Sequence, residues 1–168
     1  EEQIEALKNG SIDVIFHVSQ NPSVAEKNDF SLSNTVWSFH FAAITPLRTF
    51  DESEKIRVAV PKECVNLKWF LSYRYPEWET VEYDTLEEVE KAVRGGKADC
   101  FLTTSGLVSQ FIQDGKYRSF FLTQQGDASF AVQRGDATLL SILNKTLKSM
   151  PNTMLTGALS MYESTGEK

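Results

Sequence analysis

The fold of this chain is decided by the stretch Gly10-Ser-Ile-Asp13-Val-Ile-Phe-His-Val-Ser19, whose pattern returns at Gly96-Lys-Ala-Asp99-Cys-Phe-Leu-Thr-Thr-Ser105. In both copies a short segment with the apolar spacing of a helix comes before the glycine. A glycine there can adopt the left-handed conformation that ends a helix. The apolar run that follows predicts a buried strand, and its polar end predicts the sheet edge at which α/β proteins bind ligands. The repeat favours two α/β lobes that face each other, or else two ordinary α/β units of one sheet.

The composition excludes several classes of protein. The chain has 168 residues and a formal net charge of -6 at pH 7. Its Lys and Arg residues are scattered, so it lacks the basic stripe that binds nucleic acid. No apolar run approaches the roughly 18 residues that span a bilayer. Two cysteines, Cys64 and Cys100, do not make a disulfide framework, and this low cysteine use fits either the cytoplasm or a Gram-positive exterior.

Hydrophobic periodicity and turn residues predict a mixed α/β chain. We expect strands at 12–18, 36–45, 56–60, 79–83, 99–103 and 128–133, and helices at 2–9, 64–74, 105–113 and 137–149, with a weaker helix at 152–162. A further helix starts at a capping box of Thr85 and Glu88. We expect a polar loop at 20–28. The charged segment 49–55 is the best candidate for a boundary between two parts of the chain. From residue 56 the order β-α-β-α-β-α predicts a parallel sheet with right-handed crossovers.

Five motifs follow one another along the chain: Gly10-Ser-Ile-Asp13, Asn28-Asp29-Phe30-Ser31, Val58-Ala-Val60, Gly96-Lys-Ala-Asp99 and Phe130-Ala-Val-Gln-Arg-Gly-Asp136. Their order resembles the family 3 extracellular solute-binding proteins, the amino-acid-binding branch of the periplasmic binding protein type 2 fold. The resemblance implies two α/β lobes joined by two crossover strands, with a ligand cleft between them. It places 1–48 and 127–168 in lobe one and 49–126 in lobe two, and it implies that the opening of lobe one precedes residue 1.

The sequence departs from the amino-acid binders of that family at three places. Val24 stands where they carry an Arg that clamps the ligand carboxylate. Thr104 stands where they carry an acid that pairs the ligand ammonium, and Glu63-Cys64 replaces a Gly-Ser or Gly-Thr pair. A carboxylate left unpaired in a closed cleft would cost on the order of several kcal/mol. We therefore expect the fold to carry over, whereas amino-acid specificity does not.

Polar residues at the strand ends of both lobes predict where a ligand binds, because hinge closure brings such ends together across a cleft. They are Ser19, Gln20 and Asn21 in lobe one, and Lys62, Glu63, Thr103, Thr104 and Ser105 in lobe two. If a ligand binds, Lys62 and Glu63 predict that it carries charge or several hydroxyl groups, since an apolar ligand would leave both unpaired. The alternative is that these residues are ordinary caps and turns in a domain that binds nothing.

Metal and catalytic chemistry have weaker support. His17 and His40 are the only histidines, and no Cys or carboxylate stands at a metal-ligand spacing from them. We expect either His to line the cleft or to pack against aromatic residues. Three residues could act as nucleophiles but show no paired base in the sequence: Ser19, Ser105 and Cys64. Glu63 is the residue that could support an enzyme, yet a lone Glu at a helix start is usually favoured by the helix dipole. We expect no cofactor, no metal and no catalysis.

The sequence therefore predicts an extracytoplasmic solute-binding-type sensor domain that recognises a small molecule for a membrane-bound signalling protein. The helix over 138–151 resembles the closing helix of such domains fused to histidine kinases or diguanylate cyclases, and the polar tail 163–168 suits a connection to a membrane helix outside this chain. A free receptor of an ABC importer is the alternative, and a dehydratase-like enzyme of the same fold is a distant one. We also expect a homodimer or swapped assembly, which would cover the face that a partial lobe one exposes.

Overall fold

The computed structural model describes residues 2–150. The helices are α1 (Glu2–Lys8), α2 (Pro22–Lys27), α3 (Val65–Arg74), α4 (Leu86–Arg94), α5 (Val108–Ile112) and α6 (Ala137–Ser149), and a 3-10 turn covers Ser105–Leu107. The strands are β1 (Val14–Ser19), β2 (Phe30–Leu32), β3 (Trp37–Thr45), β4 (Arg57–Pro61), β5 (Glu79–Tyr83), β6 (Cys100–Thr104) and β7 (Arg118–Gln133). The helix predicted at 152–162 lies outside the described residues.

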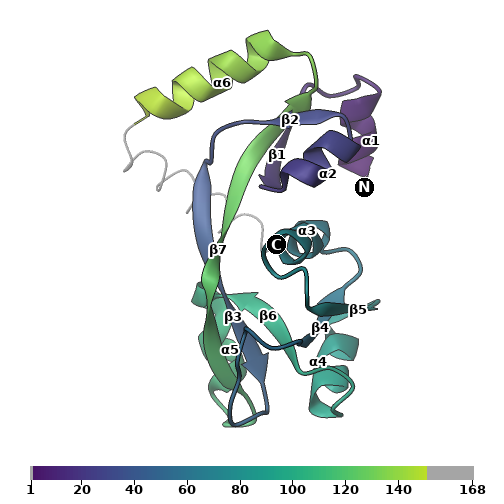
Figure 1. The fold of residues 1–168 in the computed structure, drawn as a ribbon, viewed down its shortest axis with the longest axis vertical. Coiled ribbons are helices and arrows are strands. Elements are labelled where there is room, and N and C mark those ends of the chain that lie inside the picture. The colour runs from purple at the N-terminus through teal and green to yellow at the C-terminus, as the bar shows by residue number, and fades with distance from the viewer. Residues whose placement is uncertain (1, 151–168) are drawn as a thin grey trace.

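One sheet connects two lobes. Its strand order is β1-β7-β3-β6-β4-β5, and β2 also pairs with β7. Figure 1 shows β3 and β7 running from α1, α2, β1 and β2, which we call lobe one, to α3, α4, α5 and β4 to β6, which we call lobe two. The two crossing strands pair with each other in antiparallel orientation. Strand β4 is parallel to both β5 and β6. The predicted two-lobed α/β fold with two crossover strands and a parallel sheet is confirmed.

The crossover strand β7 is longer than the predicted strand at 128–133, because it starts at Arg118. Its central part, from Thr123 to Asp127, is polar and mostly exposed, so its composition resembles a loop. Pairing with β3, which extends from Trp37 opposite Ala128 to Thr45 opposite Arg118, supplies the hydrogen bonds that keep it extended.

Each lobe has its own apolar core. In lobe two the parallel strands are covered on both faces, as is typical of α/β sheets. One face packs under α3, with Val58, Val60, Phe70, Leu71 and Cys100. The other face packs under α4 and α5, with Ala59, Val89, Val93, Phe101 and Val108. The lobe-one core is smaller and contains Leu7, Ile15, Val18, Ala25, Phe30 and Ala131. Cys100 is fully buried, and both Cys100 and Cys64 are free thiols.

The loop predicted at 20–28 is wrong, because residues 22–27 form helix α2. The Asn-Pro pair that suggests a turn instead starts this helix. The Asn21 side chain accepts a hydrogen bond from the Val24 amide at 3.3 Å, and Pro22 occupies the first turn, where its missing N–H costs nothing.

The other local signals behave as predicted. Gly10 and Gly96 have φ values of 82° and 76°, which places both copies of the repeated glycine in the left-handed region. The Thr85 hydroxyl accepts from the Glu88 amide at 3.2 Å, so the capping box of α4 is present. Its second half differs in one detail, since the Glu88 carboxylate accepts from the Asp84 amide at 3.0 Å and not from that of Thr85.

Candidate ligand-binding cleft

The predicted lobe-one residues Ser19 and Asn21 lie where the two lobes meet. Strand β1 ends at Ser19, which is buried, and its amide donates to the side-chain oxygen of Asn66 in α3 at 3.0 Å. The Asn21 side-chain amide donates to the Trp69 carbonyl at 2.9 Å and to the Ser72 hydroxyl at 3.0 Å, both also in α3. These two residues therefore contact lobe two directly.

Gln20, the third predicted residue of lobe one, points into its own lobe. Its side-chain amide donates to the Ser33 carbonyl at 3.0 Å and to the Ser129 hydroxyl. Its backbone amide donates to the Asp127 carbonyl at 2.9 Å, which continues the pairing of β1 with β7. Gln20 thus has partners within lobe one that suit a structural role.

The predicted residues Lys62 and Glu63 follow β4 and precede α3. The Lys62 ammonium pairs with the Asp84 carboxylate at 2.9 Å, and this hydrogen bond and charge raise the pKa of Lys62. Glu63 is exposed, and among residues 2–150 its carboxylate has no hydrogen bond or ion pair. Lys62 is therefore already neutralised by a neighbour, whereas Glu63 is not.

The remaining predicted residues end strand β6. This strand pairs in parallel with β4, with Val58 opposite Cys100 and Ala59 opposite Phe101, and therefore ends at the same edge of the sheet as Lys62 and Glu63. Thr103 is buried opposite Ala42, and Thr104 lies opposite Phe41 of the crossover strand β3. Ser105 is exposed and starts the 3-10 turn. None of the three is among the lining residues of the two pockets described next. The structure thus places Lys62 and Glu63 in the lining of a pocket, whereas Thr103, Thr104 and Ser105 share their sheet edge but do not line this pocket.

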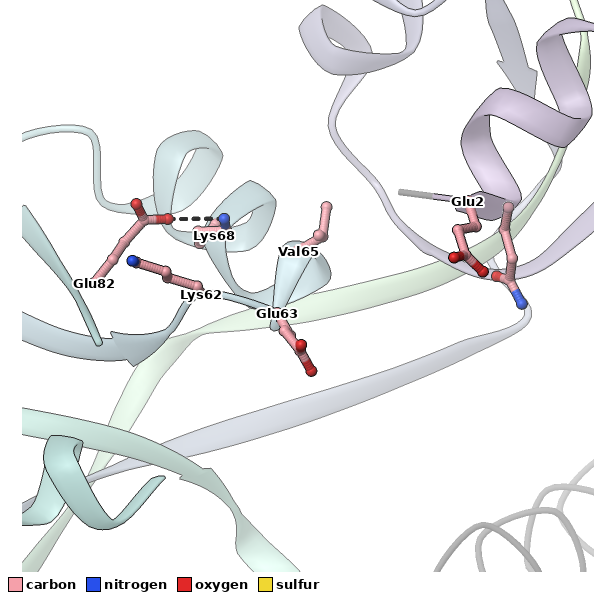
Figure 2. A pocket seen from close by; sticks show the side chains of 7 residues that line it. Glu2, Lys62, Glu63, Val65, Lys68 and Glu82 are labelled. Atoms are coloured by element: carbon pink, nitrogen blue, oxygen red, sulfur yellow. Dashed lines mark hydrogen bonds and ion pairs between the residues drawn. The ribbon is translucent and has the colours of Figure 1, made fainter. Parts of the chain in front are cut away.

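A pocket of about 690 Å³ lies between α1 of lobe one and the start of α3 in lobe two. Figure 2 shows Glu2 on one side of this space and Glu63 and Val65 on the other. Lys68 pairs with Glu82 at 2.8 Å on the lobe-two side, and this hydrogen bond lowers the pKa of Glu82. Both lysines of the pocket are thus paired with carboxylates, while Glu2 and Glu63 have no partner within the described residues. The pocket therefore favours a cation or a group with several hydrogen-bond donors.

A second pocket of about 370 Å³ adjoins the first through Gln3, Glu63 and Val65. It is more apolar and is lined by β1 and α3, including Ile15, Val18, Leu67 and Trp69. His17 lines it too, which agrees with the expectation that a histidine lines the cleft. Burial lowers the pKa of His17, so its imidazole is neutral at pH 7. His40, by contrast, is exposed on β3.

The cleft contains residues that the sequence reasoning missed. Asn66 and Trp69 of α3 and Gln3 of α1 line the second pocket, although none follows a strand end. A single feature could have pointed to them: Asn66 is a polar residue in the first turn of a helix that directly follows Glu63-Cys64. Val24 stands at the position where the amino-acid binders carry an Arg. It packs against the lobe-one core, as do Ile4 and Trp69, so this position makes an apolar contact.

The chemistry of these groups suits binding. Burial, with the nearby charge of Glu63, raises the pKa of the Cys64 thiol, which keeps it protonated and a poor nucleophile. Within residues 2–150 no three His, Cys, Asp or Glu side chains are placed to hold a metal ion. Over the same residues, no helix is long and apolar enough to cross a membrane.

No protein-family model and no curated protein sequence matches the chain. Solved structures do match. A double mutant of the VFT2 domain of BvgS from Bordetella pertussis is 27% identical with a TM-score of 0.68, over 95% of this chain and 72% of that one. The L-cysteine solute receptor of Neisseria gonorrhoeae is 19% identical with a TM-score of 0.66, over 95% and 68%. The whole BvgS periplasmic domain is 27% identical with a TM-score of 0.64, over 91% of this chain and 31% of that one.

Proposed function

Because the chain has the type 2 periplasmic-binding-protein fold, we propose that it is an extracytoplasmic solute-binding-type sensor domain of a membrane-bound signalling protein. The observation that carries the proposal is the match over 95% of this chain to the periplasmic VFT2 domain of BvgS, at 26% identity against 19% for the L-cysteine receptor. The sequence resemblance of the segment around α6 to the closing helix of membrane-attached sensor domains supports the same conclusion.

The ligand of the proposed sensor is a small molecule with a cationic or donor-rich group. This follows from the pocket beside α1, where the Glu63 carboxylate is unpaired while Lys62 and Lys68 are neutralised by Asp84 and Glu82. The apolar second pocket would accept an adjoining hydrocarbon part. A standard amino acid fits poorly, because its carboxylate would meet Glu63 without an Arg clamp.

A thermal-shift screen of cationic and polyhydroxylated metabolites tests the ligand proposal. A true ligand should lose about tenfold or more in affinity for Glu63→Gln, which removes a charge-assisted hydrogen bond. Glu77→Gln is the matched control, because Glu77 is exposed in the turn between α3 and β5 and lines neither pocket. A ligand whose affinity falls equally for both variants is attracted by net charge and would contradict this site.

The coding sequence beyond Lys168 separates the proposed sensor from its main alternative. A transmembrane segment and a cytoplasmic output domain would support the sensor, and a stop codon would support a free receptor of an ABC importer. The structural similarity to the L-cysteine receptor, with a TM-score of 0.66, supports the alternative of an importer receptor. The hypothesis of a dehydratase-like enzyme has less support, because Glu63 has no acid or base partner among the described residues.

A further inference from the structure

Helix α3 belongs to lobe two by its packing but contacts lobe one along a second face. Phe70 and Leu71 lie in the lobe-two core. Asn66, Trp69 and Ser72 follow one another at a spacing of three, which places them on a common face of the helix. All three contact lobe one, and Figure 1 shows α3 opposite α2 across the space between the lobes.

Asn66 contacts the backbone of β1. Its side-chain oxygen accepts from the Ser19 amide at 3.0 Å, and its side-chain nitrogen donates to the His17 carbonyl at 3.1 Å. These backbone groups belong to the residues on either side of Val18 and face away from β7, because Gln20 donates its own amide to β7. One amide side chain thus satisfies an acceptor and a donor on the edge of β1 that faces away from β7.

The contact at Asn21 continues the same interface. The Asn21 side-chain nitrogen donates to two groups of α3, the Trp69 carbonyl and the Ser72 hydroxyl. Its side-chain oxygen accepts from the Val24 amide and so caps α2. The Trp69 indole packs against the lobe-one core, with its ring 6.3 Å from that of Phe30. Apolar burial therefore accompanies four hydrogen bonds between the lobes, and all these contacts are between protein groups.

We propose that α3 is an intramolecular latch that holds the two lobes closed without a ligand. The polar groups of Ser19, His17 and Asn21 that meet α3 are already paired with it, so their pairing does not need a ligand. A molecule that reaches the edge of β1 has to displace Asn66. The closed state is therefore the resting state, and a signal arises from opening or from a change within the closed state. This inference does not rest on the proposed function and applies to an importer receptor as well.

Amide hydrogen exchange measured by NMR tests the latch, because two neighbouring amides report on different contacts. The Ser19 amide is held by Asn66 across the interface, and the Gln20 amide is held by Asp127 within lobe one. The protein is unfolded in denaturant, dialysed to remove any bound molecule and refolded. The latch predicts that both amides are protected in this ligand-free protein. Rapid exchange of Ser19 beside slow exchange of Gln20 would overturn it.

Two variants separate lobe opening from a local effect. Asn66→Leu removes the Ser19 contact, and Asn21→Ser keeps a capping oxygen on α2 but removes the donors to α3. Each should speed Ser19 exchange by about tenfold or more, which is the loss expected when two hydrogen bonds no longer favour closure. Gln20 should stay protected in both, which shows that lobe one remains folded.

The Asn21→Ser result is decisive, since Asn21 does not contact the Ser19 amide. Faster Ser19 exchange in this variant means that the lobes open as a unit. Unchanged Ser19 exchange would overturn the latch and leave only separate local contacts. Asn144→Ala is the matched control, because Asn144 of α6 accepts from the Asn34 amide at 2.7 Å in the segment between β2 and β3 and does not contact α3 through this bond, and it should leave Ser19 exchange unchanged.

Discussion

At the scale of single residues, the two copies of the repeated aspartate have different roles. Asp99 accepts from the Arg57 backbone amide at 2.8 Å and from its guanidinium at 3.1 Å, which ties the start of β6 to β4. Asp13 occupies the same place in the first copy but is exposed, and within the described residues its side chain has no hydrogen bond or ion pair. The same motif is thus a cross-strand anchor in lobe two and a surface residue in lobe one.

This difference predicts that Asp99→Ala lowers the free energy of unfolding by about 1–2 kcal/mol, a range reduced because the guanidinium is partly exposed. Asp13→Ala should change it by less than about 0.5 kcal/mol. Urea unfolding followed by circular dichroism measures both. Equal effects of the two substitutions would contradict the assignment of the anchor to Asp99.

The contribution of Asp99 should also depend on pH. Burial raises the pKa of this carboxyl, but the hydrogen bonds and charge of Arg57 outweigh it and hold the pKa below its ordinary value of 3.8. A group with a lowered folded-state pKa stabilises the fold above its unfolded-state pKa and loses this effect as the pH falls through the folded-state value. The difference in stability between wild type and Asp99→Ala should therefore be constant from pH 7 to about pH 5 and shrink below about pH 4.

At the scale of elements, the crossover ladder depends on a close approach between its strands. Gly126 of β7 lies opposite Phe39 of β3, and a Cβ there would lie 2.5 Å from the Phe39 ring. That ring is held between Trp37 and Phe41, with centroids 5.3 Å and 5.0 Å away. The strands can pair here because residue 126 lacks a side chain.

Gly126→Ala should therefore destabilise the protein by about 1–3 kcal/mol through overpacking. Adding Phe39→Leu removes the ring atoms that clash, so the double variant should be more stable than the sum of the two single effects predicts. A double-mutant cycle by thermal or urea unfolding measures this coupling. Strict additivity would show that the ring moves aside without cost.

At the scale of the whole molecule, the fold is shared with an amino-acid receptor, whereas the residues expected to bind an amino acid are different. The structure shares its two-lobed fold with an L-cysteine receptor, yet it carries Val24 packed in lobe one and Glu63 unpaired at the cleft. We expect no tight binding of free standard amino acids. At a hundredfold excess over its Kd, a ligand would stabilise the fold by about 2.7 kcal/mol. A rise of several degrees in Tm with any standard amino acid would contradict this expectation.

The assembly expected from the sequence stays a prediction at this scale. Light scattering at micromolar concentration measures it directly. A particle of twice the chain mass agrees with a homodimer or swapped assembly, and a monomer contradicts it.

Much of the molecule follows from local chemistry. Gly10 separates α1 from β1 in lobe one, and Gly96, the capping box at Thr85 and the alternation of apolar runs with amphipathic segments determine the helices and strands of lobe two. The order of these elements determines the parallel sheet, because a helix between two strands returns the chain so that the next strand runs in the same direction. Such signals act within a few residues, so they can be read along the chain.

Tertiary structure alone decided the rest. The polar part of β7 is a strand because β3 lies beside it, and Thr103 to Ser105 do not line the pocket that Lys62 and Glu63 line, although β6 ends at the same sheet edge as β4. Asn66 pairs with β1 from 47 positions away in the chain. Contacts of this kind depend on how two lobes meet, and neither side of the contact carries a local pattern for it. The sequence by itself therefore determined the elements and their order, whereas the packing of the lobes determined which polar residues share a cleft.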